Sequence, residues 1–302
     1  MRTLTDSGPH AADPETLRAR LSTDGYVYLR GLLPVAAVER AGAAVRAALA
    51  AGGWADVEGR PLGDPRALNA REAVSDPAYL RAAGTPPFNR IPYLNPLRSM
   101  VRSLLGADAF SYPVKVLRAV YPEGREPPRG RYVHADYLGT AVNDMVTTWI
   151  PLMPIPRRLG GLAVLPGSHR GGPQPLRVLG DADEGWASID YAMGDVLLFH
   201  CLTSHAALPN RGDRLRLSQD SRWQSGSQPA PTRMIYGPKD PGHGEVYNRL
   251  FHHRPWWEPV PATLRTMSRE QLYDLPMWSR FFPVDAHPWE QRIAIRRRHP
   301  EL

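Results

Sequence analysis

Two histidines and one aspartate in the middle of the chain could hold a metal ion: His134, Asp136 and His205. His134 and Asp136 lie two residues apart within residues 132–137, which predict a β-strand, so both side chains would point to one face. Two histidines and one carboxylate occupy one face of an octahedral metal and leave three positions open. Nitrogen and oxygen ligands without a thiolate favour Fe(II), and the open positions suit oxygenase chemistry.

A candidate site for a dicarboxylate co-substrate follows this triad. Arg216 stands eleven residues after His205, and Ser218 comes two residues later. A guanidinium can hold a carboxylate through two parallel hydrogen bonds. A dicarboxylate that chelates iron at one end needs such a group at the other end. The spacing places Arg216 and Ser218 on one strand face, where the hydroxyl could add a further hydrogen bond.

Other histidines compete for the role of third ligand. His200 lies five residues before His205, so on a continuous strand the two rings would face opposite sides. We therefore predict a structural role for His200. His169 follows a Pro-Gly turn, and we predict that it bonds to backbone within a loop.

Three basic residues are candidates for binding an acidic group of a substrate. Lys115 and Arg118 lie on the strand that precedes the His134 triplet, and Arg222 shares the predicted face of Arg216. For Lys115 and Arg118, a salt bridge at the rim of a barrel is the alternative interpretation.

The elements that position these residues are short strands after an initial helical region. Segments rich in β-branched and aromatic residues, separated by turn residues, predict strands at 26–29, 114–121, 132–137, 145–152, 162–165, 195–200 and 215–223. Helical patterns are predicted at 17–21, 34–49, 77–83 and 95–105. Many short strands at modest spacing indicate a mainly β sandwich or barrel with flanking helices.

Composition excludes several classes of protein. The chain has 302 residues and is 42% hydrophobic, which is typical of a globular protein. No apolar run approaches the roughly 18–20 residues of a membrane helix, and the first residues contain no apolar signal-peptide core. The single cysteine, Cys201, excludes an internal disulfide and a zinc site built on paired cysteines. We therefore expect a cytoplasmic protein.

The net charge of +7 does not by itself indicate nucleic-acid binding. Among the 37 basic residues, Lys115 and Lys239 are the two lysines, which leaves 35 arginines scattered along the chain. This bias is typical of a GC-rich genome. We expect a small-molecule substrate and no nucleic acid or membrane partner, while a homo-oligomer is compatible with the sequence. The basic balance mildly favours an acidic substrate.

The ordered set of motifs resembles the phytanoyl-CoA dioxygenase family of Fe(II)/2-oxoglutarate-dependent oxygenases, in its bacterial hydroxylase-like branch. The resemblance covers roughly residues 17–225. A lone His-x-Asp triplet is a weak signal, whereas the whole series is specific. The matching segments are Asp24–Val27, His134–Asp136, Trp149, Gly160–His169, Gly194–His200, His205, Pro209–Asn210 and Arg216–Ser218.

The resemblance implies a double-stranded β-helix, a squashed barrel of two sheets with the metal at one mouth. It implies Fe(II) as cofactor and 2-oxoglutarate and dioxygen as co-substrates. Arg216 and Ser218 would bind 2-oxoglutarate, with Trp149 and Thr147 lining its pocket. The sequence departs from the family pattern at Ala207, where a hydroxyl often helps to bind the co-substrate.

We therefore expect hydroxylation of an unactivated C–H bond of a small molecule, with release of succinate and CO2. Desaturation, epimerisation or cyclisation by the same machinery is the nearest alternative, and a barrel that binds a ligand without turnover is another. We predict one oxygenase domain over residues 1–302. Its predicted parts are a flexible tail (1–16), a helical support (17–110), the β-helix core (111–225) and a Pro- and aromatic-rich extension (226–302).

Overall fold

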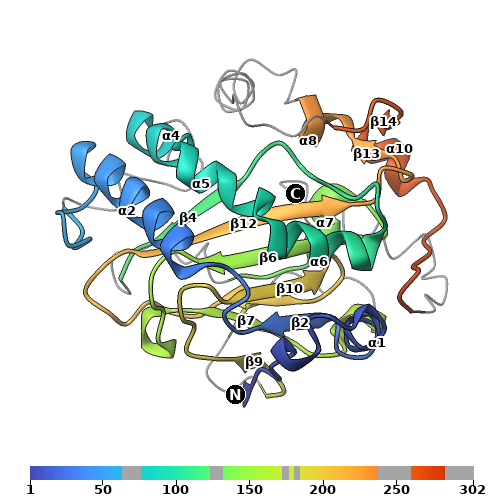
Figure 1. Cartoon of the computed structure of the whole chain (residues 1–302), viewed down its shortest axis with the longest axis horizontal. Coiled ribbons are helices and arrows are strands. Elements are labelled where there is room, and N and C mark those ends of the chain that lie inside the picture. The colour runs from blue at the N-terminus through green and yellow to red at the C-terminus, as the bar shows by residue number, and fades with distance from the viewer. Residues whose placement is uncertain (63–75, 123–131, 172–176, 180–183, 237–259, 283–302) are drawn as a thin grey trace.

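Two facing β-sheets form the centre of the molecule, and helices cover the outer face of the larger one (Figure 1). The computed structural model describes residues 1–62, 76–122, 132–171, 177–179, 184–236 and 260–282. The predicted mainly β class and double-stranded β-helix are confirmed. Within the described residues, no helix is long and apolar enough to cross a membrane.

The larger sheet has six strands in the order β2-β10-β6-β12-β3, with β4 also paired to β12. Its strands are β2 (Tyr26–Leu29), β3 (Phe110–Ser111), β4 (Val116–Val120), β6 (Met145–Pro151), β10 (Val196–His200) and β12 (Arg216–Gln224). All of these pairs are antiparallel. The strands predicted at 26–29, 145–152, 195–200 and 215–223 lie in this sheet.

The smaller sheet has the order β1-β9-β7-β11. Its strands are β1 (Arg2–Thr3), β7 (Leu162–Val164), β9 (Ala187–Ser188) and β11 (His205–Ala207). A separate pair, β5 (Tyr132–Val133) with β8 (Arg177–Val178), is linked to β11 by a bridge between His134 and His205. This bridge brings two of the predicted metal ligands together at the backbone level.

The helices lie mostly before the strands of the barrel. They are α1 (Pro14–Asp24), α2 (Val35–Ala51), α4 (Pro77–Ala83), α5 (Pro86–Arg90), α6 (Asn95–Leu105), α7 (Tyr137–Thr140), α8 (Thr232–Tyr236) and α10 (Arg269–Tyr273). Four 3₁₀ turns accompany them within the described residues: η1 (Gly8–His10), η3 (Ile91–Tyr93), η5 (Arg157–Leu159) and η6 (Ser168–Gly171). A parallel pair, β13 (Ala230–Pro231) and β14 (Thr266–Met267), packs near α8 and α10 (Figure 1).

The two faces of the larger sheet carry different cores because side chains alternate along a strand. The inward residues Trp149 and Leu197 pack with Val164 of the smaller sheet. The outward residues Ile150 and Leu198 belong to the core that α2 and α6 complete. In α6, the buried residues Leu97, Met100, Val101, Leu104 and Leu105 recur at helical spacing.

The ends of α1 show how local sequence sets the boundaries of a helix. The Asp13 carboxylate accepts hydrogen bonds from the backbone N–H groups of Glu15 and Thr16, which caps the first turn. Gly25 ends the helix with a φ of 78°, and a Cβ there would lie 2.4 Å from Nδ1 of His169. Only glycine meets both requirements, so the chain can turn directly into β2.

Three features differ from the sequence prediction. The first residues do not form a loose tail, because β1 pairs with β9 and Leu4 is buried in the inner core. The strand predicted at 132–137 ends at Val133, and Asp136 has helical backbone angles before α7. The short strand β11 was not predicted, since three residues are too few to give a periodic pattern. Within the predicted 226–302 extension, residues 237–259 and 283–302 lie outside the described residues.

Candidate metal centre

The structure brings His134, Asp136 and His205 to one point at the edge of the barrel. One ligand atom from each residue lies within 4.8 Å of the other two. His134 follows β5, Asp136 begins the α7 turn and His205 opens β11. Convergence therefore depends on the His134–His205 bridge and the turn at Asp136, rather than on two-residue spacing along one strand.

Backbone carbonyls select which nitrogen of each imidazole can bind a metal. Nδ1 of His134 lies 2.9 Å from the carbonyl oxygen of Tyr132, and Nδ1 of His205 lies 3.0 Å from that of Thr203. Because a carbonyl can only accept a hydrogen bond, both Nδ1 atoms carry the proton and donate. Each Nε2 then keeps its lone pair for a metal.

Burial keeps both imidazoles neutral, which is the form that ligates metals. Burial and the neighbouring His134 lower the pKa of His205 to about 3, and burial also lowers the pKa of His134. The rings lie 4.2 Å apart between centroids. Two adjacent buried imidazoles resist protonation, so both remain available as ligands near neutral pH.

Asp136 is buried but ionised. Burial alone would raise its pKa, but the charge and hydrogen bond of the Arg222 guanidinium outweigh burial and hold the pKa well below its usual range. Nη2 of Arg222 donates to Oδ1 at 2.8 Å, and the Thr147 hydroxyl donates to Oδ2. Each carboxylate oxygen has two lone pairs, so these bonds orient Asp136 and still leave it able to bind a cation.

This donor set fits the Fe(II) that the sequence predicted. Two neutral imidazole nitrogens and one carboxylate match the facial triad of non-haem iron oxygenases. Cys201 is buried and its thiol contacts the carbonyl oxygens of Val142 and Asn143. Its pKa is raised by burial, so it offers no thiolate.

The predicted co-substrate residues share the inward face of the larger sheet. Arg216 is 1% exposed and donates from Nη1 to the Ser218 hydroxyl at 2.6 Å. Its guanidinium carbon lies 5.8 Å from the centroid of the Trp149 ring. A buried guanidinium on this face is the group that a distal carboxylate would require.

Thr147 and Arg222 lie at the metal end of the same face, as register partners on β6 and β12. Both contact Asp136 in the structure, although Thr147 was predicted to line the co-substrate pocket and Arg222 to bind a substrate anion. Lys115 is 2% exposed, and it donates from Nζ to the Ser111 hydroxyl at 2.8 Å and to the carbonyl oxygen of Tyr112.

Sequence reasoning missed Asp220, which lies between Ser218 and Arg222 on the inward face of β12. Oδ2 of Asp220 accepts from Nε of Arg118 at 2.6 Å, so the alternative interpretation of Arg118 as a salt-bridge residue describes this contact. Oδ1 is buried and has no hydrogen-bond donor among the described residues. The alternation Arg-x-Ser-x-Asp-x-Arg was the signal that could have revealed it.

The two competing histidines lie outside the triad. His200 is fully buried, with Nε2 at 3.3 Å from Oδ1 of Asp144. His169 contacts the carbonyl oxygen of Ser22 through Nε2 at 2.9 Å, a backbone bond as predicted. Asp144 was also missed, because nothing in its local sequence distinguishes it from a surface turn residue.

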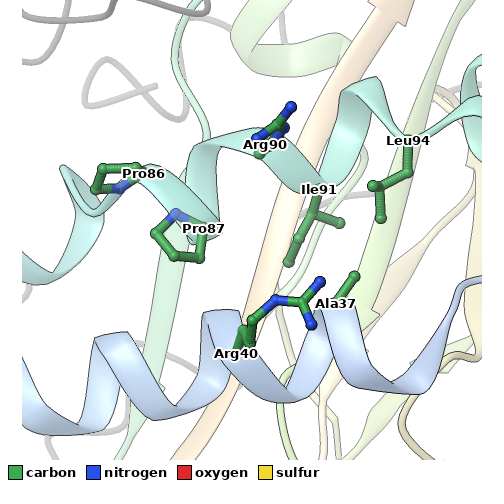
Figure 2. A pocket seen from close by; sticks show the side chains of 7 residues that line it. All are labelled: Ala37, Arg40, Pro86, Pro87, Arg90, Ile91 and Leu94. Atoms are coloured by element: carbon green, nitrogen blue, oxygen red, sulfur yellow. The ribbon is translucent and has the colours of Figure 1, made fainter.

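A groove of about 360 Å³ lies on the other side of the larger sheet, between α2 and α5 (Figure 2). Its lining residues are Ala37, Arg40, Pro86, Pro87, Arg90, Ile91 and Leu94. None of them belongs to the triad or to the inward face of the barrel. The groove therefore does not serve as the reaction site.

Comparison with known proteins agrees with this geometry. The model of the phytanoyl-CoA dioxygenase (PhyH) family matches residues 21–218, a span that includes the triad, Arg216 and Ser218. The chain belongs to the PhyH family. It is therefore a non-haem iron, 2-oxoglutarate-dependent oxygenase, and the sequence-based assignment is confirmed.

The chain is similar to two 1-deoxypentalenic acid 11-beta-hydroxylases, from Streptomyces arenae and Streptomyces exfoliatus. Each is 30% identical over 251 residues, which cover 74% of this chain and 85% of the relative.

Solved structures show the same fold at lower identity. The epimerase SnoN, in complex with Fe3+, alpha ketoglutarate and nogalamycin RO, aligns with a TM-score of 0.52 and 22% identity, covering 83% of this chain and 95% of SnoN. EctD from S. alaskensis, with 2-oxoglutarate and 5-hydroxyectoine, aligns with a TM-score of 0.51 and 21% identity, covering 89% of this chain and 95% of EctD.

Proposed function

We propose that this PhyH-family oxygenase hydroxylates an unactivated C–H bond of a small carboxylic acid. In that reaction, substrate, dioxygen and 2-oxoglutarate give hydroxylated substrate, succinate and CO2. The observation that carries the proposal is the triad, with both imidazoles oriented by carbonyls and Asp136 held ionised by Arg222. The similarity to hydroxylases of 1-deoxypentalenic acid supports the outcome and the substrate class.

His134, Asp136 and His205 would hold Fe(II), which supplies the redox chemistry with dioxygen when bound. Thr147 and Arg222 fix the orientation of the Asp136 carboxylate, so this side chain need not reorganise when the metal binds. Arg222 also prevents protonation of Asp136. The chain thus presents a ligand set that is already oriented and correctly protonated.

Arg216 and Ser218 would hold the distal carboxylate of 2-oxoglutarate. Arg216 is almost fully buried, so a carboxylate paired with it would be shielded from water and salt. Trp149 is also buried on this face, and its ring lies beside the Arg216 guanidinium. Arg216 therefore sets how far the co-substrate lies from the triad.

Arg118 is our choice among the three basic residues for the substrate carboxylate. Its side chain is 43% exposed, whereas Arg222 is bound to Asp136 and Lys115 is buried against Ser111. The pair with Asp220 uses Nε of Arg118 and fixes the direction of its guanidinium. We propose that the terminal nitrogens of Arg118 meet the acid group.

We further propose that the chain forms one oxygenase domain and works in the cytoplasm without a nucleic-acid or membrane partner. The similarity to a hydroxylase supports the single oxygenase domain, because the alignment covers 74% of this chain. The fully buried thiol of Cys201 and the paucity of cysteine suit a reducing compartment.

The test is conversion of 2-oxoglutarate to succinate by the Fe(II)-loaded protein, first without and then with 1-deoxypentalenic acid as a probe acid. We expect basal succinate that depends on Fe(II) and is lost in His134→Ala. With an accepted acid, succinate should increase and the product should be one oxygen atom heavier.

A product two hydrogens lighter would indicate desaturation or cyclisation in place of hydroxylation, and a product of unchanged mass would indicate epimerisation. Absence of succinate in a protein that retains iron would contradict the oxygenase assignment. Arg118→Met should raise the KM for the acid, whereas Arg40→Met, which removes an exposed arginine of the outer groove, should leave that KM unchanged.

A further inference from the structure

Asp144, just before β6, is a fully buried carboxylate at the centre of a hydrogen-bond cluster behind the triad. It accepts from Nε2 of His200 at 3.3 Å and from the Ser279 hydroxyl at 2.6 Å. It also accepts from the backbone N–H of Arg280 at 2.7 Å and from Nε of Arg280 at 3.3 Å. Four donors from two distant parts of the chain therefore converge on one side chain.

His200 connects this carboxylate to a loop. Its Nδ1 accepts a hydrogen bond from the backbone N–H of Leu202 at 3.2 Å, so the proton of the neutral ring lies on Nε2 and points to Asp144. The backbone N–H of Thr203 donates to the carbonyl oxygen of His200 at 2.8 Å. The orientation of the ring thus fixes the start of residues 201–204, which lead into His205.

The same loop holds two of the three proposed metal ligands. The carbonyl oxygen of Cys201 accepts from the backbone N–H of Tyr137 at 2.9 Å, directly after Asp136. The carbonyl oxygen of Thr203 accepts from Nδ1 of His205 at 3.0 Å. A shift of this loop would therefore move Asp136 and rotate His205 together.

Residues 279–282, which we term the clamp, close the cluster from the C-terminal side. Phe281 and Phe282 place their rings edge-on to His200, with centroids at 5.8 and 4.9 Å. Arg280 also donates from Nη1 to the carbonyl oxygen of Leu105 at 2.6 Å, at the end of α6. The clamp is thus tied to the helical layer as well as to Asp144.

We propose that Asp144 is a positioning residue for the metal centre and that the clamp holds it in place. The proposal rests on the proposed metal role of His134, Asp136 and His205. The route runs from the clamp to Asp144, then through His200 and loop 201–204 to the ligands. The family match ends at residue 218, so it does not include the C-terminal extension. The proposal gives the clamp, which lies in this extension, a function.

The experiment compares Asp144→Asn and the double variant Ser279→Ala/Arg280→Met with wild type. An amide cannot accept all four hydrogen bonds, because its NH2 group would face donors, yet it keeps the shape of the carboxylate. Trp278→Ala is the matched control, since Trp278 adjoins the clamp and is 46% exposed. His134→Ala tests the triad itself.

Two quantities are measured for each variant: anaerobic Fe(II) affinity with 2-oxoglutarate, and thermal unfolding of the metal-free protein. The visible charge-transfer band of the Fe(II)–2-oxoglutarate complex reports the geometry of the site. We expect about tenfold weaker Fe(II) binding and a shifted charge-transfer band in both Asp144→Asn and Ser279→Ala/Arg280→Met, at temperatures far below unfolding. Trp278→Ala should bind Fe(II) as wild type does.

Wild-type affinity and an unchanged band in Ser279→Ala/Arg280→Met would overturn the proposal, even if that variant unfolds at a lower temperature. If Asp144→Asn fails to fold, the double variant alone decides, because both of its side chains lie outside the β-sheets. Full Fe(II) binding by His134→Ala would instead contradict the triad, which separates failure of the proposed function from failure of the clamp.

Discussion

Loop 201–204 joins two pairs of neighbouring histidines, His134 with His205 and His169 with His200. Only the first pair belongs to the proposed metal centre. The rings of His134 and His205 are 4.2 Å apart, and each donates from Nδ1 to a backbone carbonyl. The rings of His169 and His200 are 6.2 Å apart, and both contact Phe282 edge-on. In the first pair the carbonyl bonds of Nδ1 leave Nε2 as the nitrogen that can bind a metal, whereas Nε2 of His200 bonds to Asp144 and Nε2 of His169 to a carbonyl.

The comparison teaches that burial does not distinguish a ligand from a structural histidine. Both His200 and His205 are buried, and burial lowers the pKa of both His169 and His205. What differs is the partner of Nε2. We infer that a histidine can serve as a metal ligand here where the backbone accepts the Nδ1 proton and no group among the described residues bonds to Nε2.

The largest expected effect separates the pairs directly. His205→Ala removes one of three proposed ligands, so iron retention and succinate formation should be abolished. His169→Gln keeps a polar group at the second pair and should retain iron. Metal content of the purified variants, loaded anaerobically and desalted, provides the measurement. Iron loss in His169→Gln with full retention in His205→Ala would reverse the assignment of the two pairs.

Arg222→Met tests the charge beside the first pair. Without its partner, the buried Asp136 carboxylate is uncompensated, and breaking a buried pair costs about 3–5 kcal/mol. We expect the metal-free protein to lose about this much free energy of unfolding, measured by urea denaturation. Added Fe(II) should restore part of the loss, because the cation replaces the guanidinium. Equal destabilisation with and without Fe(II) would argue that Arg222 acts independently of the metal.

Arg216→Ala tests the distal end of the same barrel face. Loss of a desolvated, charge-assisted pair should raise the KM for 2-oxoglutarate by a factor that corresponds to about 2–5 kcal/mol. Iron binding without 2-oxoglutarate should remain, since Arg216 contacts Ser218 and Trp149 rather than the triad. An unchanged KM in steady-state succinate assays would move this role to another arginine.

The smallest expected effect concerns pH and the second pair. Burial lowers the pKa of His169 to about 4, while an unfolded histidine titrates near 6.5. Between these values the unfolded chain binds a proton that the native ring does not, so stability falls as the pH decreases from about 6.5 to 4. The loss attributable to His169 is at most about 3 kcal/mol.

His169→Gln should flatten this part of the stability profile. The measurement is the free energy of unfolding of the metal-free variant and wild type across the interval, because bound metal would add its own pH dependence. A slope identical to that of wild type would show that His169 does not contribute.

Much of the site followed from spacing, because β12 is a regular strand. Arg216 and Ser218 share a face by simple alternation, and the same rule places Asp220 and Arg222 beside them. Helices 77–83 and 95–105 matched the predicted bounds, since a proline lies in the first turn of each, Asp76 caps the first helix, and glycine follows each end. Local sequence sufficed where local interactions decide the structure.

The rest depends on contacts between distant segments. The strand rule failed at Asp136, whose position is set by the α7 turn and by bonds from Thr147 and Arg222. Asp144 receives its partners from residues more than fifty positions away in the chain. No periodicity records such pairings, so the sequence could predict the ligands but not the groups that orient them.

The most direct test is a crystal structure of the protein loaded anaerobically with Fe(II) and 2-oxoglutarate. We predict anomalous density for iron bound by Nε2 of His134, Nε2 of His205 and a carboxylate oxygen of Asp136. The distal carboxylate of 2-oxoglutarate should meet Arg216. Iron bound through Nδ1 of either ring, or placed at His200, would contradict the account.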